Sequence, residues 1–137
     1  MENVVQYIIL RADPKTKHDG KPARGKIAAM ASHASIAFLS ERLMAGNASL
    51  NDDEREWFGG IFTKIILKAT KEEMETLMES ARTLGFTTKK DFVPIEDNCL
   101  TEFLPDEGSD RCLAAIGFRP MRRERIKSLV GHLSLFK

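Results

Sequence analysis

Apolar positions in this chain recur at two spacings, one typical of strands and one typical of helices. Short runs of β-branched and aliphatic residues predict four strands, over residues 4–10, 63–68, 86–95 and 112–117. Pro94 interrupts the third run and has no backbone N–H, so we expect this strand to lie at an edge or to end there.

Helical spacing and capping residues predict four helices, over residues 26–44, 52–58, 70–84 and from 120 or 121 to about 130. Asn51 can cap the second helix. Thr70 and Glu73 form the pattern of a capping box at the start of the third, and Gly85 stands where a C-terminal cap is expected. Three apolar residues are expected to pack the C-terminal tail against the body: Leu133, Leu135 and Phe136.

This order of strands and helices predicts an α/β fold, a three-layer sandwich in which a four-stranded mixed β-sheet is flanked by helices on both faces. The length of 137 residues suits a single domain over residues 1–137 with a continuous core. Polar loops over residues 13–25 and 96–110 connect the elements, and the first is long enough to be mobile or functional.

The composition is that of a globular protein, with 42% hydrophobic and 30% charged residues and a formal net charge of +1. Affinity for nucleic acid would therefore have to come from local clusters of basic residues. Two such clusters exist: Arg11, Lys15, Lys17, Lys21, Arg24 and Lys26 in the first, and Arg119, Arg122, Arg123, Arg125 and Lys127 in the second. They could follow a phosphate backbone if the fold joins them, and they are separate solvated surfaces otherwise.

The two cysteines and three histidines lack the paired spacing of a zinc site, and the cysteines do not suggest a disulfide scaffold. No apolar segment is long enough to span a membrane, since the run over residues 4–10 is a predicted strand. We expect an intracellular protein with reduced cysteines and no membrane association.

The segment over residues 25–34 carries the most chemistry, because it places Lys26 and His33 seven positions apart on one predicted helix. At about 100° per residue, four side chains fall within roughly 60° of one another on a presented face: Lys26, Met30, His33 and Ala37. An apolar stripe about a quarter turn away would pack on the core: Ile27, Ala31, Ala34 and Phe38. Arg24 and Lys26 lie at the N-terminus of this helix, where they are either solvated or stabilised by a bound anion such as phosphate.

Five groups of residues, in order across nearly the whole chain, resemble the type II peptidyl-tRNA hydrolases and their divergent eukaryotic relatives. The groups are residues 6–11 with 25–29 and 32–34; Trp57 with 64–68 and the capped helix after it; residues 95–97 with Thr101; residues 115–117; and residues 131–136. The resemblance implies a four-stranded mixed sheet between helices, in agreement with the pattern. It also implies hydrolysis of the ester between a peptide and the terminal ribose of tRNA, without a metal or an organic cofactor. The family suggests a homodimer, and we expect the protein in the cytoplasm.

Carried over from the family, four residues are predicted to be catalytic: Lys26, His33, Asp97 and Thr101. We predict that tRNA is bound by Arg11, Arg24, Lys26 and Ser32. Lys26 would bind the tRNA 3′ end or stabilise the developing oxyanion, and His33 or Asp97 would orient or deprotonate water. Each residue also has a structural interpretation: His33 as a hydrogen-bonded structural residue, Asp97 in an Asx turn and Thr101 as a local cap.

The sequence departs from the family at the same site. Met30 replaces a usual glutamine, and residues 98–102 read Asn-Cys-Leu-Thr-Glu where the family usually has Ala-Gly-Arg-Thr-Gln. Leu100 thus lacks a guanidinium, Cys99 replaces a conformationally free glycine, and Glu102 adds a negative charge where RNA should approach. Two functions therefore remain open, an active peptidyl-tRNA esterase and a weakly active or inactive relative that binds RNA or protein. Hydrolysis of another ester is a third.

Overall fold

The computed structural model describes residues 3–18 and 20–137. Within them the chain forms six strands and four helices, joined by loops. Residues 1, 2 and 19 lie outside these ranges, so the predicted domain and the predicted loop over residues 13–25 are described without them. The strands are β1 (Val4–Arg11), β2 (Lys64–Ala69), β3 (Phe92–Asp97), β4 (Cys112–Phe118), β5 (Met121–Arg122) and β6 (Ser134–Leu135). The helices are α1 (Arg24–Met44), α2 (Asp52–Gly59), α3 (Lys71–Thr83) and α4 (Arg123–Val130).

The strands form one mixed sheet in the order β3-β4-β1-β2-β6, and β5 pairs with the start of β1. β1 and β2 are parallel, whereas β4 is antiparallel to both β1 and β3. The four predicted strands are the long ones, but the predicted count of four was too low. The two additional strands have two residues each and come from the expected start of the last helix and from the tail.

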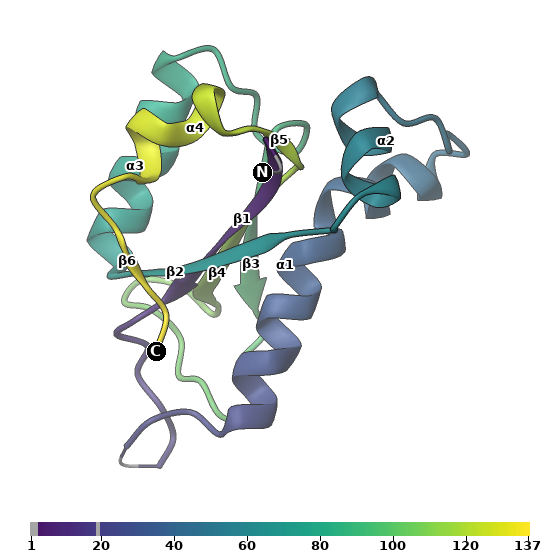
Figure 1. Cartoon of the computed structure of the whole chain (residues 1–137). Helices are drawn as coiled ribbons and strands as arrows, with labels where there is room; N and C mark the ends of the chain where they lie inside the picture. The colour runs from purple at the N-terminus through teal and green to yellow at the C-terminus, as the bar shows by residue number, and fades with distance from the viewer. Residues whose placement is uncertain (1–2, 19) are drawn as a thin grey trace.

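Helices cover both faces of this sheet, which confirms the sandwich (Figure 1). Alternate residues of β1 point to opposite faces, as the pleat of a strand requires. Ile9 joins the buried cluster under α3 and α4, whereas Ile8 and Leu10 join the cluster under α1. α2 covers one end of the sandwich, where Trp57 is fully buried.

α1 lies close against β4 because Gly117 has no side chain. A Cβ atom at this position would lie 2.0 Å from the carbonyl oxygen of Ala34 in α1. Buried Gln6 of β1 strengthens the same contact, since its amide donates to the Ser35 carbonyl at 2.7 Å and to the Phe118 carbonyl at 3.0 Å. The amide oxygen accepts from the Ser35 hydroxyl at 2.6 Å. These contacts fix the position of α1, which carries Lys26 and His33.

Several predicted boundaries were wrong. β3 begins at Phe92 instead of residue 86, because Asp91 accepts from the Thr87 N–H and closes a turn before it. Pro94 is tolerated because β3 is an edge strand of the sheet, with β4 as its neighbour on one side. The last helix begins at Arg123, since the two residues before it pair with β1. Leu135, predicted to pack inward, is 55% exposed.

Both predicted helix N-caps are present as full capping boxes. Asn51 accepts from the Glu54 N–H at 2.8 Å, and Glu54 accepts from the Asn51 N–H at 3.0 Å. Thr70 and Glu73 exchange the same pair of bonds at the start of α3. α1 begins two residues before the predicted start and has no side-chain cap of its own.

Candidate active site

A hollow of about 280 Å³ lies between the first turns of α1, the end of β3 and the loop that follows β3. Its lining includes all four residues predicted to be catalytic, together with Met30, Ile95, Glu96, Asn98 and Leu100. Lys26 and His33 come from α1, Asp97 is the last residue of β3, and Thr101 follows in the loop. The fold thus brings together residues that are up to 75 positions apart in the chain.

The Lys26 ammonium connects the two sides of the hollow. Its Nζ donates to Oδ1 of Asp97 at 2.8 Å and to the hydroxyl of Thr101 at 3.2 Å. The side chains of Lys26 and Asp97 are only 14% and 10% exposed, so water screens this ion pair weakly. An ammonium group has three N–H donors, and these two contacts leave one donor for a ligand.

Asp97 contacts Lys26 with one carboxylate oxygen and closes a turn with the other, so both interpretations of this residue from the sequence fit the structure. Its Oδ1 pairs with Lys26, while its Oδ2 accepts from the Cys99 N–H at 2.9 Å in an Asx-type turn. Cys99 has a φ of 62°, the left-handed conformation for which glycine is favoured. The turn therefore keeps the backbone shape that glycine would give and orients the carboxylate toward Lys26.

The presented face of α1 is narrower than predicted. Ala37 is only 5% exposed and belongs to the buried cluster under α1, so its assignment to the face of Lys26 was wrong. Met30 is half-buried and packs on two core clusters. The reason is that α1 lies against β3, β4 and β1 together, which widens its buried face. His33 remains exposed, and no hydrogen bond within the described residues engages its imidazole.

The loop after β3 is joined to the loop before α1. Backbone bonds run from Lys17 N–H to the Glu102 carbonyl and from Leu104 N–H to the Lys15 carbonyl, both at 2.8 Å. The Lys17 ammonium also donates to the Cys99 carbonyl at 2.7 Å. This pairing holds Thr101 opposite Lys26, and no sequence pattern predicted it, because it depends on two loops distant in the chain.

Glu102 and Phe103 were not predicted to support the site. The Glu102 carboxylate accepts from the N–H of Ala23, the N-cap of α1, at 2.8 Å. It thus supplies a negative charge at the positive end of the helix dipole, where the sequence left a bound external anion as one of two alternatives. The Phe103 ring is buried, with the Lys26 ammonium 5.2 Å from its centroid, a cation–π distance.

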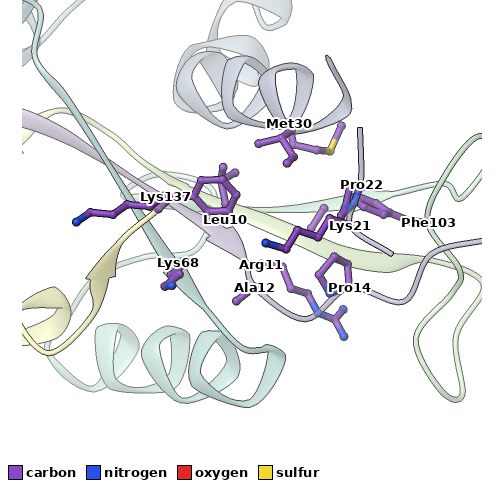
Figure 2. Close-up of a pocket in the computed structure, with 13 residues that line it drawn as sticks. Leu10, Arg11, Ala12, Pro14, Lys21, Pro22, Met30, Lys68, Phe103 and Lys137 are labelled. Carbon is purple, nitrogen blue, oxygen red and sulfur yellow. The ribbon is translucent and has the colours of Figure 1, made fainter. Parts of the chain in front are cut away.

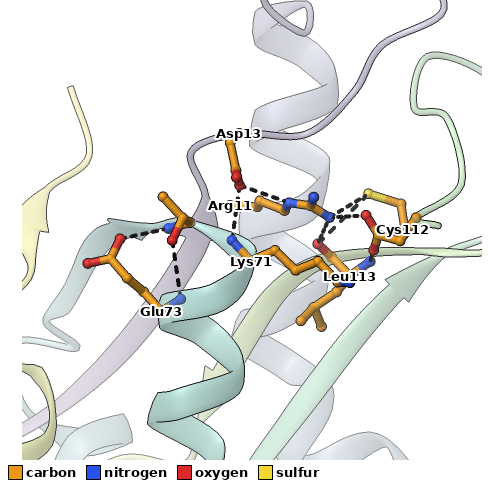
Figure 3. A network of polar contacts seen from close by, with 8 residues as sticks. Arg11, Asp13, Lys71, Glu73, Cys112 and Leu113 are labelled. Atoms are coloured by element: carbon orange, nitrogen blue, oxygen red, sulfur yellow. Dashed lines mark hydrogen bonds and ion pairs between the residues drawn. The ribbon is translucent and has the colours of Figure 1, made fainter.

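Of the residues predicted to bind tRNA, Arg11 has an internal role. Its side chain is 6% exposed and donates to Asp13 at 3.0 Å (Figure 3). It also donates to Asp106 at 2.5 Å. Burial alone would raise the pKa of Asp106, but hydrogen bonds from the Leu113 N–H and from Arg11 hold it below its usual range. Arg11 therefore joins the end of β1 to β4 and faces the protein interior.

The other predicted tRNA contacts lie at the surface. Arg24 is exposed, and no ion pair within the described residues engages it. Ser32 is exposed, and its hydroxyl donates to the Ala28 carbonyl one turn back at 2.9 Å. The two basic clusters do not meet, because the loop before α1 and the segment from β5 to α4 lie at opposite ends of the molecule (Figure 1). Arg119 and Arg122 of the second cluster pair instead with acidic side chains.

Both cysteines are free and buried in one small cluster beside the site. Burial raises the pKa of Cys99 above its usual value and that of Cys112 to about 11. A thiol needs to ionise to act as a nucleophile, so both are suited to packing. Among the described residues no group of three His, Cys, Asp or Glu side chains is placed to hold a metal ion. No helix of that part of the chain has the length and apolarity needed to cross a bilayer.

Comparison with known proteins gives consistent results over nearly the full length. Residues 4–136 match the family described as peptidyl-tRNA hydrolase PTH2. The chain is 35% identical to a peptidyl-tRNA hydrolase of Methanopyrus kandleri over 134 residues, which are 96% of this chain and 97% of the relative. It is 32% identical to a peptidyl-tRNA hydrolase of Haloquadratum walsbyi over 134 residues, covering 96% of this chain and 98% of that relative.

Proposed function

This chain belongs to the peptidyl-tRNA hydrolase PTH2 family and hydrolyses peptidyl-tRNA, and we propose that the ester is cleaved in the hollow between α1 and the end of β3. One observation carries the proposal: the Lys26 ammonium contacts both Asp97 and Thr101 and has a third donor to offer. The alternative of an inactive binding module receives no support from the structure or from the relatives.

In the proposed reaction, a water oxygen adds to the carbonyl carbon of the ester. Negative charge then develops on the carbonyl oxygen, and the free N–H of Lys26 stabilises it by about 3 kcal/mol. The bond from carbon to the ribose oxygen breaks, and that oxygen takes up a proton. The products are a peptide carboxylate and a tRNA with a free terminal hydroxyl. Thr101 holds the ester or the water through its hydroxyl.

The proposal assigns different tasks to Asp97 and His33. Both oxygens of Asp97 are engaged, by Lys26 and by the Cys99 N–H, but each oxygen retains a lone pair that can orient a water. The His33 imidazole lines the same hollow and has no internal partner within the described residues, so it is free to accept the proton. A positioned base of this kind contributes about 10²–10⁴-fold.

The cations near the start of α1, exposed Arg24 and half-buried Lys26, fit an anionic substrate. We propose that Arg24 and Lys26 attract the tRNA backbone and that Ser32 lies at the edge of the contact, whereas the internal bonds of Arg11 make it a support for the loop. We also propose a single domain over residues 1–137 that acts in the cytoplasm, as a homodimer, without a metal or an organic cofactor. Light scattering after size-exclusion chromatography tests the homodimer.

The deciding experiment measures release of N-acetyl-aminoacyl groups from tRNA by the purified protein in the presence of a chelator. Cleavage should persist with chelator and fall at least about tenfold in Asp97→Ala. Asp110→Ala is the matched control, because Asp110 is exposed and lies outside the lining of the hollow. Equal turnover by Asp97→Ala and wild type would refute the site, and absence of cleavage by folded wild type would refute the function.

A further inference from the structure

A second hollow, of about 180 Å³, opens beside the first at the carboxyl ends of the parallel strands β1 and β2 (Figure 2). The carboxyl ends of parallel strands commonly hold ligands in α/β folds, because loops leave the sheet there and frame a crevice. The loop before α1, the first turns of α1 and the last residues of the chain complete its walls. Its size suits one ring system better than a larger ligand.

The walls of this hollow are apolar and its rim is basic. Among its apolar side chains are Leu10, Ile27, Met30, Phe103 and Phe136. Its charged side chains are all cationic: Arg11, Lys21, Lys68 and Lys137. Arg11 turns its guanidinium away to its internal partners, whereas Lys21 extends toward the middle of the hollow (Figure 2).

The three lysines differ from most cations near the site in having no carboxylate partner. Within the described residues, no ion pair engages Lys21, Lys68 or Lys137, and no acidic side chain lines the hollow. Lys26, in contrast, is held by Asp97 at 2.8 Å. Unpaired ammonium groups around an apolar cavity are complementary to a ligand with a flat apolar body and an attached anion.

The two hollows share a wall. Met30 lines both of them. Phe103 lines the second hollow, and the Lys26 ammonium of the first lies 5.2 Å from the centroid of its ring. A ligand seated in the second hollow would therefore lie a few covalent bonds from the position where Lys26 can meet an ester.

We propose that the second hollow binds the 3′-terminal nucleoside of the tRNA, with the base between Met30, Phe103 and Phe136 and the adjoining phosphate at Lys21 and Lys68. This inference rests on the proposed function, because it places the ester of the same nucleoside at Lys26. In this nucleoside only a few bonds separate the base from the ribose oxygen that forms the ester. This short separation agrees with two neighbouring hollows that share Met30 in their walls. An uncharged peptide side chain would fill the apolar part but would leave the three ammonium groups without a partner.

The test uses adenosine 5′-monophosphate as the probe and the double variant Lys21→Ala/Lys68→Ala. Binding is measured by calorimetry or ligand-detected NMR, and inhibition is measured with peptidyl-tRNA as substrate. The nucleotide should compete with peptidyl-tRNA, and its Kd should rise about tenfold in the double variant, more at low salt than at high salt. The KM for peptidyl-tRNA should rise at least about fivefold. Lys90→Ala/Lys127→Ala is the matched control, since both lysines are exposed and lie outside the hollow.

A second variant tests the cavity without removing charge. Ala12 is exposed and lines the hollow, so Ala12→Leu should narrow it and weaken nucleotide binding while thermal unfolding stays near that of wild type. Unchanged nucleotide affinity in both variants would overturn the inference, and so would competition by an N-acetylated amino acid amide but not by the nucleotide. A wild-type protein that binds the nucleotide through these lysines but cleaves no ester would overturn the proposed function and leave the nucleoside site standing.

Discussion

Replacing Lys26 by methionine separates its chemical role from its structural role. The substitution keeps the length of the side chain and removes all three N–H donors, including the one available to the ester. Loss of about 3 kcal/mol of oxyanion stabilisation corresponds to a fall in kcat of about two orders of magnitude. We therefore expect Lys26→Met to retain about one hundredth of the wild-type kcat, while Lys90→Met retains nearly all of it.

The same substitution leaves the Asp97 carboxylate without its cation in a site where it is only 10% exposed. Removing one partner of a fully buried pair costs about 3–5 kcal/mol, and Asp97 keeps the Cys99 N–H and some contact with water. We expect a loss of about 2 kcal/mol in the free energy of unfolding. The double variant Lys26→Met/Asp97→Asn removes the uncompensated charge, so it should recover about half of that loss.

The two measurements together decide the role of Lys26. Single-turnover cleavage of N-acetyl-aminoacyl-tRNA gives the rate, and urea unfolding of the same samples gives the stability. If Lys26 contacts the ester, the double variant regains stability and remains at least as slow as Lys26→Met. If the double variant recovered activity together with stability, Lys26 would act only by neutralising Asp97. A Lys26→Met rate near that of wild type would refute both the contact with the ester and any catalytic effect of neutralising Asp97.

Three further substitutions test the rim of the hollow and two contacts that hold α1 in the fold. Leu100 is 83% exposed beside the hollow. Because an arginine there could contact a phosphate, Leu100→Arg should lower the KM for peptidyl-tRNA a few-fold at low salt and have little effect at high salt. An equal effect on KM at both salt concentrations would refute a phosphate contact. Burial alone would raise the pKa of Glu54, but hydrogen bonds from Arg42 lower it below 4.5. Its stabilising contribution is therefore present above that pH and lost as the pH falls through the lowered pKa, and Glu54→Gln should flatten this part of a pH–stability curve. Gly117→Ala should cost at least about 3 kcal/mol in urea unfolding, because the new Cβ would lie 2.0 Å from the Ala34 carbonyl oxygen and backbone would have to move; a cost below about 1 kcal/mol would refute that contact.

The elements predictable from the sequence are those fixed by local interactions. The capping boxes at Asn51 and Thr70 each involve a partner three residues away, and both are present. The four long strands follow from runs of apolar residues, which need only the rule that a buried strand is apolar on both faces. The start of β3 was misjudged because Phe86 is apolar and buried under α3 and α4 without belonging to a strand. Hydrophobic pattern records burial and does not by itself give the backbone conformation.

The candidate site was only partly predictable, because its geometry depends on contacts between distant segments. The family pattern assigned Lys26, Asp97 and Thr101 to one set of catalytic residues, and the fold places the Lys26 ammonium within hydrogen-bond distance of the other two. The burial of Met30 could not be derived from helical spacing, since it depends on how many strands α1 covers. The role of Glu102 required knowing that the loop after β3 returns to the start of α1.

The departures from the family pattern have unequal consequences once their surroundings are considered. Met30 packs on the core and so replaces a polar side chain by an apolar contact. Cys99 keeps the left-handed backbone of a glycine and buries its thiol, and Glu102 directs its charge to the N-terminus of α1, where the helix dipole favours an anion. Each of these three side chains makes its contacts within the protein, and the Lys26–Asp97 ion pair is present beside them. The other two departures, Asn98 and Leu100, are exposed at the hollow. We therefore expect this hydrolase to differ from the family in its affinity for the substrate more than in the bond-breaking step.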